Sequence, residues 1–356
     1  LRLKEFFQIS SGGSQDRRIL LLTLEGEGLQ GWGECVASAD PSYAYETTDT
    51  SWHVLTDFIL PSVVGTELHS PEAVLDPVWW IRGHGMAKAA VEMASWDMAA
   101  RADGVSLSQK IGGVRDRVPV GVSVGIKDTD EELHDQVQGF IEDGYARVKI
   151  KVKPGRDIDM LSGLCERFPD TVFMADANSA YTLADVDIFK ALDPLDLLMI
   201  EQPLRYDDFL HHARLQEQIE TPVCLDESIK TEWDTELALE LKSCQVINIK
   251  PGRVGGLSSS CRIHDMMEDA GLAVWCGGML ESGVGRAHNV ALASLPNFTL
   301  PGDISASSRY WDRDIVSPEF TVADGHMAVP TGHGIGVEVD TDFIESISTR
   351  VATFGV

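Results

Sequence analysis

The sequence predicts an α/β fold: a (β/α)8, TIM-type barrel with an N-terminal α+β capping domain that the C-terminal tail completes. Three observations lead to this prediction. Apolar strand-like segments recur about every 25 residues through the middle of the chain, helix-like segments fill the gaps between them, and the first third of the chain shows no such repeat. The length of 356 residues also suits about two domains.

The first third of the chain, residues 1–115, is expected to form the capping domain. Residues 19–36 carry two apolar runs on either side of a Glu-Gly-Glu-Gly turn, and this arrangement predicts a hairpin. Residues 45–112 have the pattern of helices, and 87–101 is a strong amphipathic segment among them. The cap is therefore expected to combine one hairpin with several helices.

The barrel is expected to occupy residues 116–310. Its strand-like segments are nearly continuous runs of apolar residues, which is typical of parallel strands buried on both faces. An open doubly wound sheet would give the same alternation, but eight evenly spaced units favour a closed barrel. The predicted strands are 118–126, 146–153, 171–178, 197–204, 222–229, 246–254, 273–280 and 298–305.

Helices are predicted between these strands, and several of them begin with Asp, Thr or Ser, the residues that cap helix N-termini. The glycine-rich stretches 277–285 and 332–336 lack the strand–helix context of a nucleotide-binding loop and are predicted as loops. The tail, residues 311–356, contains short strand-like pieces at 319–322 and 336–339 and is expected to return to the cap. The predicted helices are 130–143, 157–168, 183–192, 207–219, 231–241 and 256–270.

The chain is strongly acidic, with 56 Asp and Glu residues against 29 Lys and Arg residues and a formal charge of −27. Such a chain repels phosphate backbones and anionic lipid, so neither nucleic acid nor a membrane surface is expected as a partner. Hydrophobic residues make up 44% of the chain and charged residues 24%, which indicates a folded globular protein rather than a disordered acidic segment.

The cysteines and the N-terminal segment indicate a cytoplasmic protein. The six cysteines show no paired spacing, so reduced thiols are expected and a metal-thiolate site is the weaker interpretation. Residues 1–8 are too short and too mixed for a signal peptide, and the longest aliphatic run, 19–22, is far too short to span a membrane.

Three carboxylates stand in phase at the ends of predicted strands. Asp176, Glu201 and Asp226 follow one another at intervals of about 25 residues, and the active sites of (β/α)8 barrels lie at the C-terminal strand ends. Three converging carboxylates repel one another unless a cation lies between them. Oxygen ligands without nearby His or Cys favour Mg²⁺ or Mn²⁺. Helix capping or pairing with arginine would explain any one of these acids, but three in phase favour a metal site.

Lysines flank this group on two other predicted strands. Lys149 and Lys151 lie on the second strand and Lys250 on the sixth, so they face one another across an eight-stranded barrel. Burial and a nearby metal charge lower the pKa of a lysine, which then serves as a general base. A buried ion pair would explain Lys149 equally well. The chemistry that fits is removal of the proton next to a carboxylate, because a metal-bound carboxylate stabilises the resulting enediolate.

These motifs resemble the muconate-lactonizing subgroup of the enolase superfamily. Within it, the chain is most similar, over almost its whole length, to the o-succinylbenzoate synthase / N-acylamino acid racemase family. The motifs that carry the resemblance are Lys149-Ile-Lys151, Asp176-Ala-Asn178, Ile200-Glu-Gln-Pro203, Leu225-Asp-Glu-Ser228, Asn248-Ile-Lys-Pro-Gly-Arg253-Val-Gly-Gly256, Cys276-Gly-Gly-Met-Leu-Glu281, Pro301-Gly-Asp303 and Gly31-Trp-Gly-Glu34.

The resemblance implies a role for each matched position. Asp176, Glu201 and Asp226 would bind Mg²⁺, Mn²⁺ or another divalent cation. Lys151 and Lys250 would be the acid–base pair, and Lys149 would support the electrostatics of the site. For the remaining positions, the resemblance implies substrate binding by Ser123, Asn178, Arg253, Gly278 and Met279, and support around the site by Glu227 and Asn248. Ordinary packing or capping explains several of these positions equally well.

The resemblance also implies the chemistry. The family's synthase reaction dehydrates a cyclohexadiene carboxylate to o-succinylbenzoate for menaquinone synthesis, and its racemase reaction inverts N-acylamino acids, such as N-succinylamino acids, through the same enediolate. A small carboxylate would be the substrate and a homo-oligomer the assembly. The polar segment 10–15 would be a flexible cover over the barrel mouth. A dipeptide epimerase, a muconate cycloisomerase and a non-catalytic carboxylate-binding barrel are the alternatives.

Overall fold

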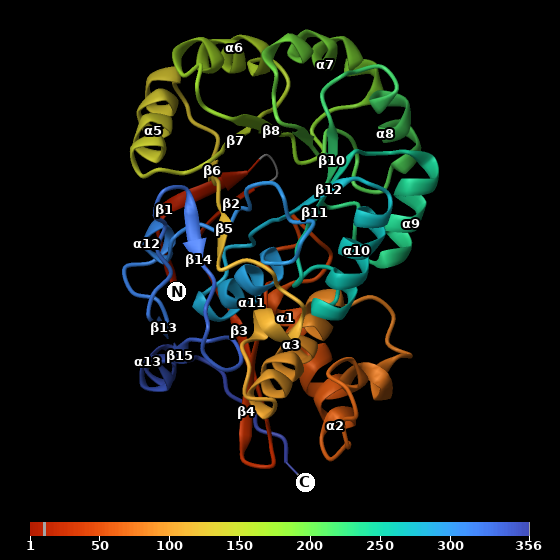
Figure 1. The fold of residues 1–356 in the computed structure, drawn as a ribbon, viewed down its shortest axis with the longest axis vertical. Coiled ribbons are helices and arrows are strands. Elements are labelled where there is room, and N and C mark those ends of the chain that lie inside the picture. Colours follow the sequence, from red (N-terminus) through yellow and green to blue (C-terminus); the bar gives the residue numbers. More distant parts are fainter. Residues whose placement is uncertain (10–11, 356) are drawn as a thin grey trace.

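The computed structural model describes residues 1–9 and 12–355. Strands form an inner ring, helices cover it on the outside, and a hairpin and helices from the N-terminal part lie below it (Figure 1). Within the described residues, seven parallel strands form one sheet in the order β12-β11-β10-β9-β8-β7-β6. The strands are β6 (Val122–Val124), β7 (Val148–Lys151), β8 (Phe173–Asp176), β9 (Ile200–Glu201), β10 (Val223–Leu225), β11 (Val246–Ile249) and β12 (Ala273–Cys276).

The predicted eighth strand, 298–305, is wrong as a regular strand, although this segment closes the ring. It meets β12 through a single bridge at Phe298 and meets the segment before β6 through a single bridge at Gly302. The Gly302 N–H donates to the Pro119 carbonyl at 3.0 Å. Pro301 has no N–H to donate, so a continuous hydrogen-bond ladder cannot run through this segment.

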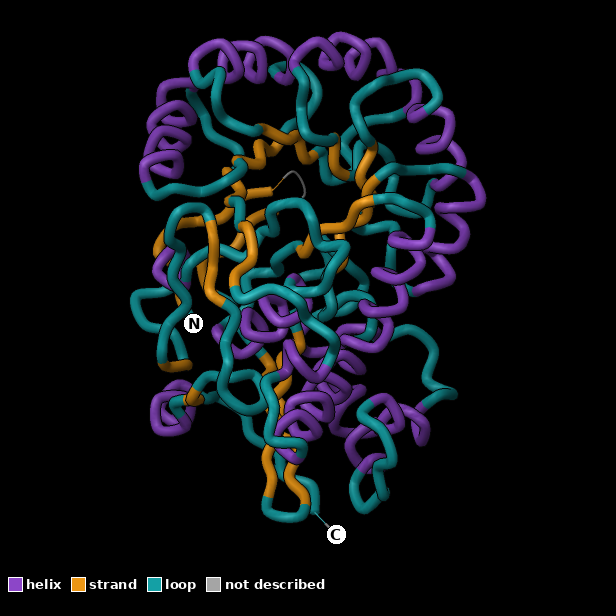
Figure 2. The backbone as a smooth tube through the Cα atoms, in the orientation of Figure 1, coloured by secondary structure: helices purple, strands orange, loops and turns teal. Residues whose placement is uncertain are grey.

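The helices of the outer layer match the predictions closely (Figure 2). Thr129 and Thr231 accept hydrogen bonds from the first turns that follow them, as N-caps do. One helix was not predicted: α11 begins at Gly283, inside a stretch predicted as a loop, because the Ser282 side chain caps it. The helices are α5 (Asp130–Glu142), α6 (Asp157–Arg167), the 3-10 turn η3 (Leu183–Asp185) with α7 (Val186–Leu192), α8 (Phe209–Gln216), α9 (Glu232–Leu241), α10 (Leu257–Asp269) and α11 (Gly283–Ala293).

The N-terminal part packs the antiparallel hairpin of β3 (Leu20–Gly26) and β4 (Leu29–Cys35) against α3 (Gly85–Ala102). A Cβ at Gly31 would lie 2.0 Å from the Ala94 carbonyl oxygen, so the two backbones touch. The predicted helix at 87–101 is confirmed, but it is not amphipathic, because α3 is buried against the hairpin and against α10 of the barrel as well. The other elements are α1 (Thr48–Val54), the π-helix η1 (Leu55–Ile59), α2 (Leu60–Val63), η2 (Glu72–Val78) and α4 (Leu107–Lys110).

The segment expected to be a flexible cover is mostly a strand. β1 (Arg2–Ile9) pairs with β2 (Gly12–Asp16) in an antiparallel hairpin. Residues 12–15 of the expected cover therefore have a regular backbone that the pairing holds in place, and residues 10–11 lie outside the described residues. The base of this hairpin, at Asp16, borders the cavity described below.

The C-terminal tail contacts both parts of the molecule. β14 (His326–Ala328) pairs with β5 (Arg117–Pro119), which directly precedes the first barrel strand, and the Ile335 N–H donates to Asp97 of α3 at 2.7 Å. The predicted strand at 319–322 is wrong, because the Phe320 N–H binds the Ser307 hydroxyl instead of a neighbouring strand. The remaining elements are α12 (Ser307–Tyr310), β13 (Val316–Ser317) paired with β15 (Glu338–Val339), and α13 (Thr341–Ile347). The domain boundaries near residues 115 and 310 stay predictions.

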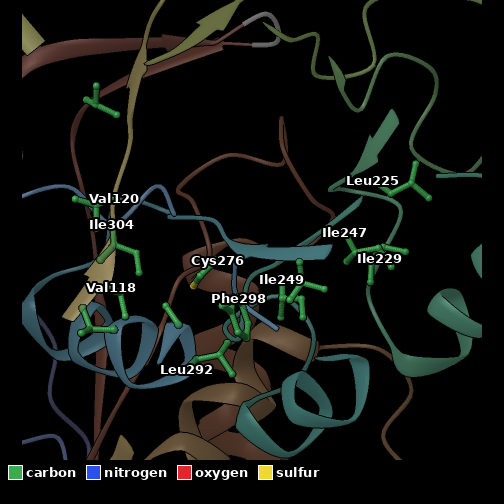
Figure 3. Close-up of a cluster of buried hydrophobic side chains, with 14 of the residues drawn as sticks. Val118, Val120, Leu225, Ile229, Ile247, Ile249, Cys276, Leu292, Phe298 and Ile304 are labelled. Atoms are coloured by element: carbon green, nitrogen blue, oxygen red, sulfur yellow. The ribbon is translucent and has the colours of Figure 1, made fainter. Parts of the chain in front are cut away.

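The main hydrophobic core lies in the layer between the strands and the outer helices. Figure 3 shows part of it, including Val118 and Ile304, which come from the first and last segments of the barrel sequence. A smaller cluster around Trp275 fills the barrel interior, and a separate one lies between the hairpin and α3. All six cysteines are free thiols. None of the helices in the described part of the chain is long and apolar enough to cross a bilayer.

Candidate active site

The parallel register of the sheet brings the charged residues of the predicted site side by side. Lys151 on β7 pairs in register with Asp176 on β8, and Asp176 pairs with Glu201 on β9. Asp226 follows β10 directly, and Lys250 follows β11. All five lie at the C-terminal ends of their strands, where a barrel opens to its ligands, and all are buried.

Lys149 is surrounded by carboxylates. Its Nζ lies 3.0 Å from Asp176 Oδ2, 2.8 Å from Glu201 Oε2 and 2.7 Å from Asp303 Oδ2. Burial alone lowers the pKa of Lys149, but the three carboxylates, Asp303 foremost, outweigh burial and raise it well above its usual value. The raised pKa favours the charged form of Lys149, which suits electrostatic support of the site.

The two other lysines each bind one carboxylate and one further polar group. Lys151 Nζ lies 2.6 Å from both Asp176 Oδ2 and Asn178 Oδ1. Lys250 Nζ lies 2.7 Å from Asp226 Oδ2. Burial lowers the pKa of Lys250, but Asp226 outweighs burial and raises the pKa above its usual value, so burial alone does not produce the expected fall.

The carboxylates differ from one another in electrostatics. The pKa of Glu201 is raised to about 8, first by burial and then by repulsion from Asp176. The pKa of Asp176 is lowered, because Lys151 and Lys149 outweigh its burial. Asn248, predicted as a supporting residue, donates to Glu201 Oε1 at 2.7 Å. The surroundings of Glu201 therefore disfavour its negatively charged form, whereas those of Asp176 favour it.

A cavity of about 140 Å³ lies between the barrel mouth and the cap. Four of the five residues predicted to bind substrate line it, namely Ser123, Asn178, Gly278 and Met279. The fifth, Arg253, does not border it. Three lysines and Asp303 lie on the barrel side, and loop residues from the N-terminal part lie on the other. The lining residues are Asp16, Arg17, Arg18, Ser38, Ala39, Asp40, Ser42, Tyr43, Ser123, Lys149, Lys151, Asn178, Lys250, Gly278, Met279, Leu280, Asp303 and Tyr310.

Comparison with known proteins accounts for this arrangement. Residues 2–112 match the N-terminal domain of the mandelate racemase / muconate lactonizing enzyme family, and residues 132–343 match the enolase C-terminal domain-like family. The chain belongs to the enolase superfamily. The lysines and carboxylates at the strand ends are therefore the candidate catalytic machinery of an enolase-superfamily enzyme.

Several relatives of this superfamily member have names that state an activity. It is 49% identical to the o-succinylbenzoate synthase of Geobacillus stearothermophilus, over 99% of this chain and 95% of the relative. It is 48% identical to the N-succinylamino acid racemase of Thermus thermophilus, over 98% of this chain and 94% of the relative. The solved structure of an enolase-superfamily member from Listeria innocua superposes with a TM-score of 0.94 at 42% identity, covering 97% of this chain and 94% of that one.

Enzymes of this superfamily use a divalent metal ion, typically Mg²⁺. Asp176, Glu201 and Asp226 fit such an ion by their chemistry: they are buried oxygen donors, and Glu201 is held next to another negative charge. In this structure they bind lysines and do not close into one tight group. Among the described residues, the His, Cys, Asp and Glu group whose donor atoms lie within 4.8 Å of one another is instead on α10 (His264, Asp265 and Glu268), where both acids are exposed.

Arg253 supports the site from outside the cavity. Its guanidinium forms a very short ion pair with Asp226 Oδ1, and its Nη2 donates to the Asn248 carbonyl at 2.7 Å. Glu227 likewise acts indirectly, by accepting a hydrogen bond from Asn178 at 2.9 Å. Arg253 does not border the cavity, so the prediction that it touches substrate stays a prediction.

Sequence reasoning missed Tyr43 altogether. Its hydroxyl accepts hydrogen bonds from Lys250 Nζ and Arg253 Nη1, each at 3.1 Å, and its ring lies under the Lys250 ammonium, 4.9 Å from the ring centroid. Burial, then Asp226, raises the pKa of Tyr43 to about 12, so the hydroxyl stays neutral. Tyr43 lies in a loop before α1 with no periodic signal, so no sequence pattern could have found it.

Proposed function

We propose that this enzyme uses Mg²⁺ to remove the proton next to a substrate carboxylate, as an o-succinylbenzoate synthase, an N-succinylamino acid racemase, or both. The observation that carries the proposal is that Lys151 and Lys250 border one cavity from strands on different sides of the carboxylate series. The names of the relatives support the two activities. Bound Mg²⁺, held by Asp176, Glu201 and Asp226, would supply positive charge for the substrate carboxylate and its enediolate.

The two lysines have complementary tasks in this proposal. Lys151, in its neutral form, takes the α-proton through Nζ, while Asn178 and Asp176 hold that nitrogen in position. Lys250 is kept protonated by Asp226 and offers an ammonium group to the negative charge that develops on the substrate. Lys149, whose surroundings also favour its charged form, adds positive charge on the barrel side of the cavity.

The two reactions differ only after the shared step. In racemisation, Lys250 returns a proton to the α-carbon from the face opposite Lys151, so the configuration is inverted. In the synthase reaction, Lys151 gives the proton that it has removed to the departing hydroxyl group, which leaves as water while the electron pair forms the new double bond. The same pair of lysines serves both outcomes because the enediolate is common to them.

Exchange of the α-proton in D₂O tests the shared step. With Mg²⁺ present, the enzyme should exchange the α-proton of an N-succinylamino acid, and chelation should stop the exchange. Rates for the cyclohexadiene carboxylate, N-succinylamino acids, dipeptides and muconate, measured side by side, separate the alternatives. If the enzyme exchanges the α-proton of none of these acids, the proposal that it is an enzyme of this kind is wrong. If a dipeptide or muconate reacts faster than the others by orders of magnitude, that compound class is the substrate instead of the two proposed here.

A further inference from the structure

Arg17 is a buried arginine on the cap side of the cavity. It follows β2, only 6% of its surface is exposed, and it borders the cavity together with the three lysines. Its Nη2 donates to the carbonyl oxygens of Val36 at 3.1 Å and Met279 at 3.0 Å, and its Nη1 donates to Ser38 Oγ at 3.2 Å. These are neutral acceptors, so they leave the charge of the guanidinium uncompensated.

No carboxylate within the described part of the chain forms an ion pair with Arg17, and its Nε has no hydrogen-bond partner there. A buried charge normally requires a partner, because the removal of a charge from water is unfavourable. Glu34 and Glu281 act on Arg17 only at longer range, since Glu34 accepts from Ser282 and Glu281 accepts from the Met279 N–H. Burial accordingly lowers the pKa of Arg17.

The other cations around the cavity are already paired. Lys149, Lys151 and Lys250 each bind carboxylates, and Arg18 binds Asp49 at 2.9 Å at the exposed edge. Among the described residues that border the cavity, Arg17 is therefore the cation that lacks a carboxylate partner. Asp16 and Asp40 also border the cavity. Asp40 acts on Arg17 as well, but without an ion pair, and both acids are exposed, so water screens their charge.

We propose that Arg17 binds a second carboxylate of the substrate, at the end far from the reacting carbon. This inference rests on the proposed function and assigns one residue of the cap to the recognition of that second carboxylate. The two activities named for the relatives share a succinyl group, which ends in a carboxylate. Arg17 extends from the cap side of the cavity and the lysines from the barrel side, so one elongated dianion can bind to both.

A purely structural role for Arg17 makes a different prediction. Its bond to the Met279 carbonyl ties the loop at 277–282 to the cap, and loss of this tie would impair every substrate equally. A binding role would impair only substrates that carry the distal charge. The experiment therefore compares N-succinylphenylalanine with its N-succinamoyl analogue, in which a neutral carboxamide replaces the distal carboxylate.

The variants are Arg17→Gln, which removes the charge, and Arg17→Lys, which keeps it. Arg17→Gln should lower kcat/KM for N-succinylphenylalanine about 10- to 100-fold, mainly through KM, and should change the value for the analogue by less than about 3-fold. Arg17→Lys should retain part of the preference. Arg350→Gln, an exposed arginine that pairs with Asp49, is the control and should change neither value.

Equal losses for the two compounds in Arg17→Gln, or no loss for either, would overturn the proposal. The Kd of each compound, measured by calorimetry with Mg²⁺, tests Arg17 without requiring turnover. Wild-type enzyme that binds both compounds equally well also overturns it. Tighter binding of the succinyl compound that depends on Arg17, without α-proton exchange, supports the role of Arg17 and contradicts the proposed function alone.

Discussion

Lys250 Nζ lies 3.1 Å from the hydroxyl of Tyr43, a residue 207 positions earlier in the chain. The contact joins the cap to a proposed catalytic lysine of the barrel. Burial keeps the Tyr43 hydroxyl neutral. Its oxygen therefore accepts a hydrogen bond from the Lys250 ammonium group, while Asp226 supplies the negative charge that pairs with this group. The position of Lys250 therefore depends on how the cap lies on the barrel.

Tyr43→Phe should lower kcat about 10-fold and leave the fold intact, because Lys250 loses one acceptor and keeps its carboxylate. Initial rates of racemisation, with circular dichroism to verify folding, test this. Tyr206→Phe is the matched control, since Tyr206 is half exposed and should be silent. Unchanged rates in Tyr43→Phe would mean that Tyr43 only fills space under the ammonium.

Lys151→Ala and Lys250→Ala should each abolish racemisation, because inversion requires a base on one face of the substrate and an acid on the other. Polarimetry of either enantiomer measures this. Lys190→Ala, on the exposed side of α7, should keep wild-type activity. Racemisation that persists in either site variant would refute a mechanism with two lysines.

Mg²⁺ added to metal-free enzyme should raise the Tm, because a ligand that binds only the native state stabilises it. Chelation should reverse the rise and remove activity. Glu201→Ala should lose both responses. Glu268→Ala, in the surface group on α10, should retain them, and a loss there would move the metal site to that helix.

Asp303→Asn should destabilise the protein by about 3 to 5 kcal/mol, the usual effect of breaking a buried ion pair from one side. The carboxylate binds Lys149 at 2.7 Å and Arg147 at 2.6 Å, and the asparagine would leave both cations short of a partner. Urea unfolding measures the change. Asp207→Asn, which breaks an exposed pair with Arg205, should cost less than about 1 kcal/mol.

His212 makes stability depend on pH. Burial lowers its pKa to about 4, and its Nε2 accepts a hydrogen bond from the Leu204 N–H at 3.2 Å, so the folded ring is neutral. The unfolded ring gains a proton below about pH 6.5, and the folded ring does so only near its own pKa. The contribution of His212 is therefore present above about pH 6.5 and is lost as the pH falls toward 4.

This loss should amount to about 3 kcal/mol at most. Unfolding free energies at pH 7 and pH 5 for wild type and His212→Gln measure it. The glutamine variant should be less stable at pH 7, but it should lose less on acidification than the wild type does. Equal losses in the two proteins would assign the pH dependence to other groups.

The regular part of the site was predictable because it depends on local periodicity. A buried parallel strand repeats about every 25 residues in this fold, so the phase of Asp176, Glu201 and Asp226 was enough to predict that they share one end of the barrel. The same periodicity failed at 298–305, where Pro301 prevents a regular ladder, and at Gly283, where a single serine cap starts a helix inside a glycine-rich stretch.

The sequence by itself determined which strands carry the charged residues and which ends those residues occupy, since alternation along a strand is a property of the local backbone. Only the tertiary structure decided the contacts made by Tyr43, Arg17 and Asp303, and the electrostatic balance that keeps Lys250 protonated. These depend on loops that reach the barrel mouth from distant parts of the chain. The physical reason is that a pKa or an unpaired charge reflects every group within a few ångströms in space, whereas a sequence pattern records only neighbours along the chain.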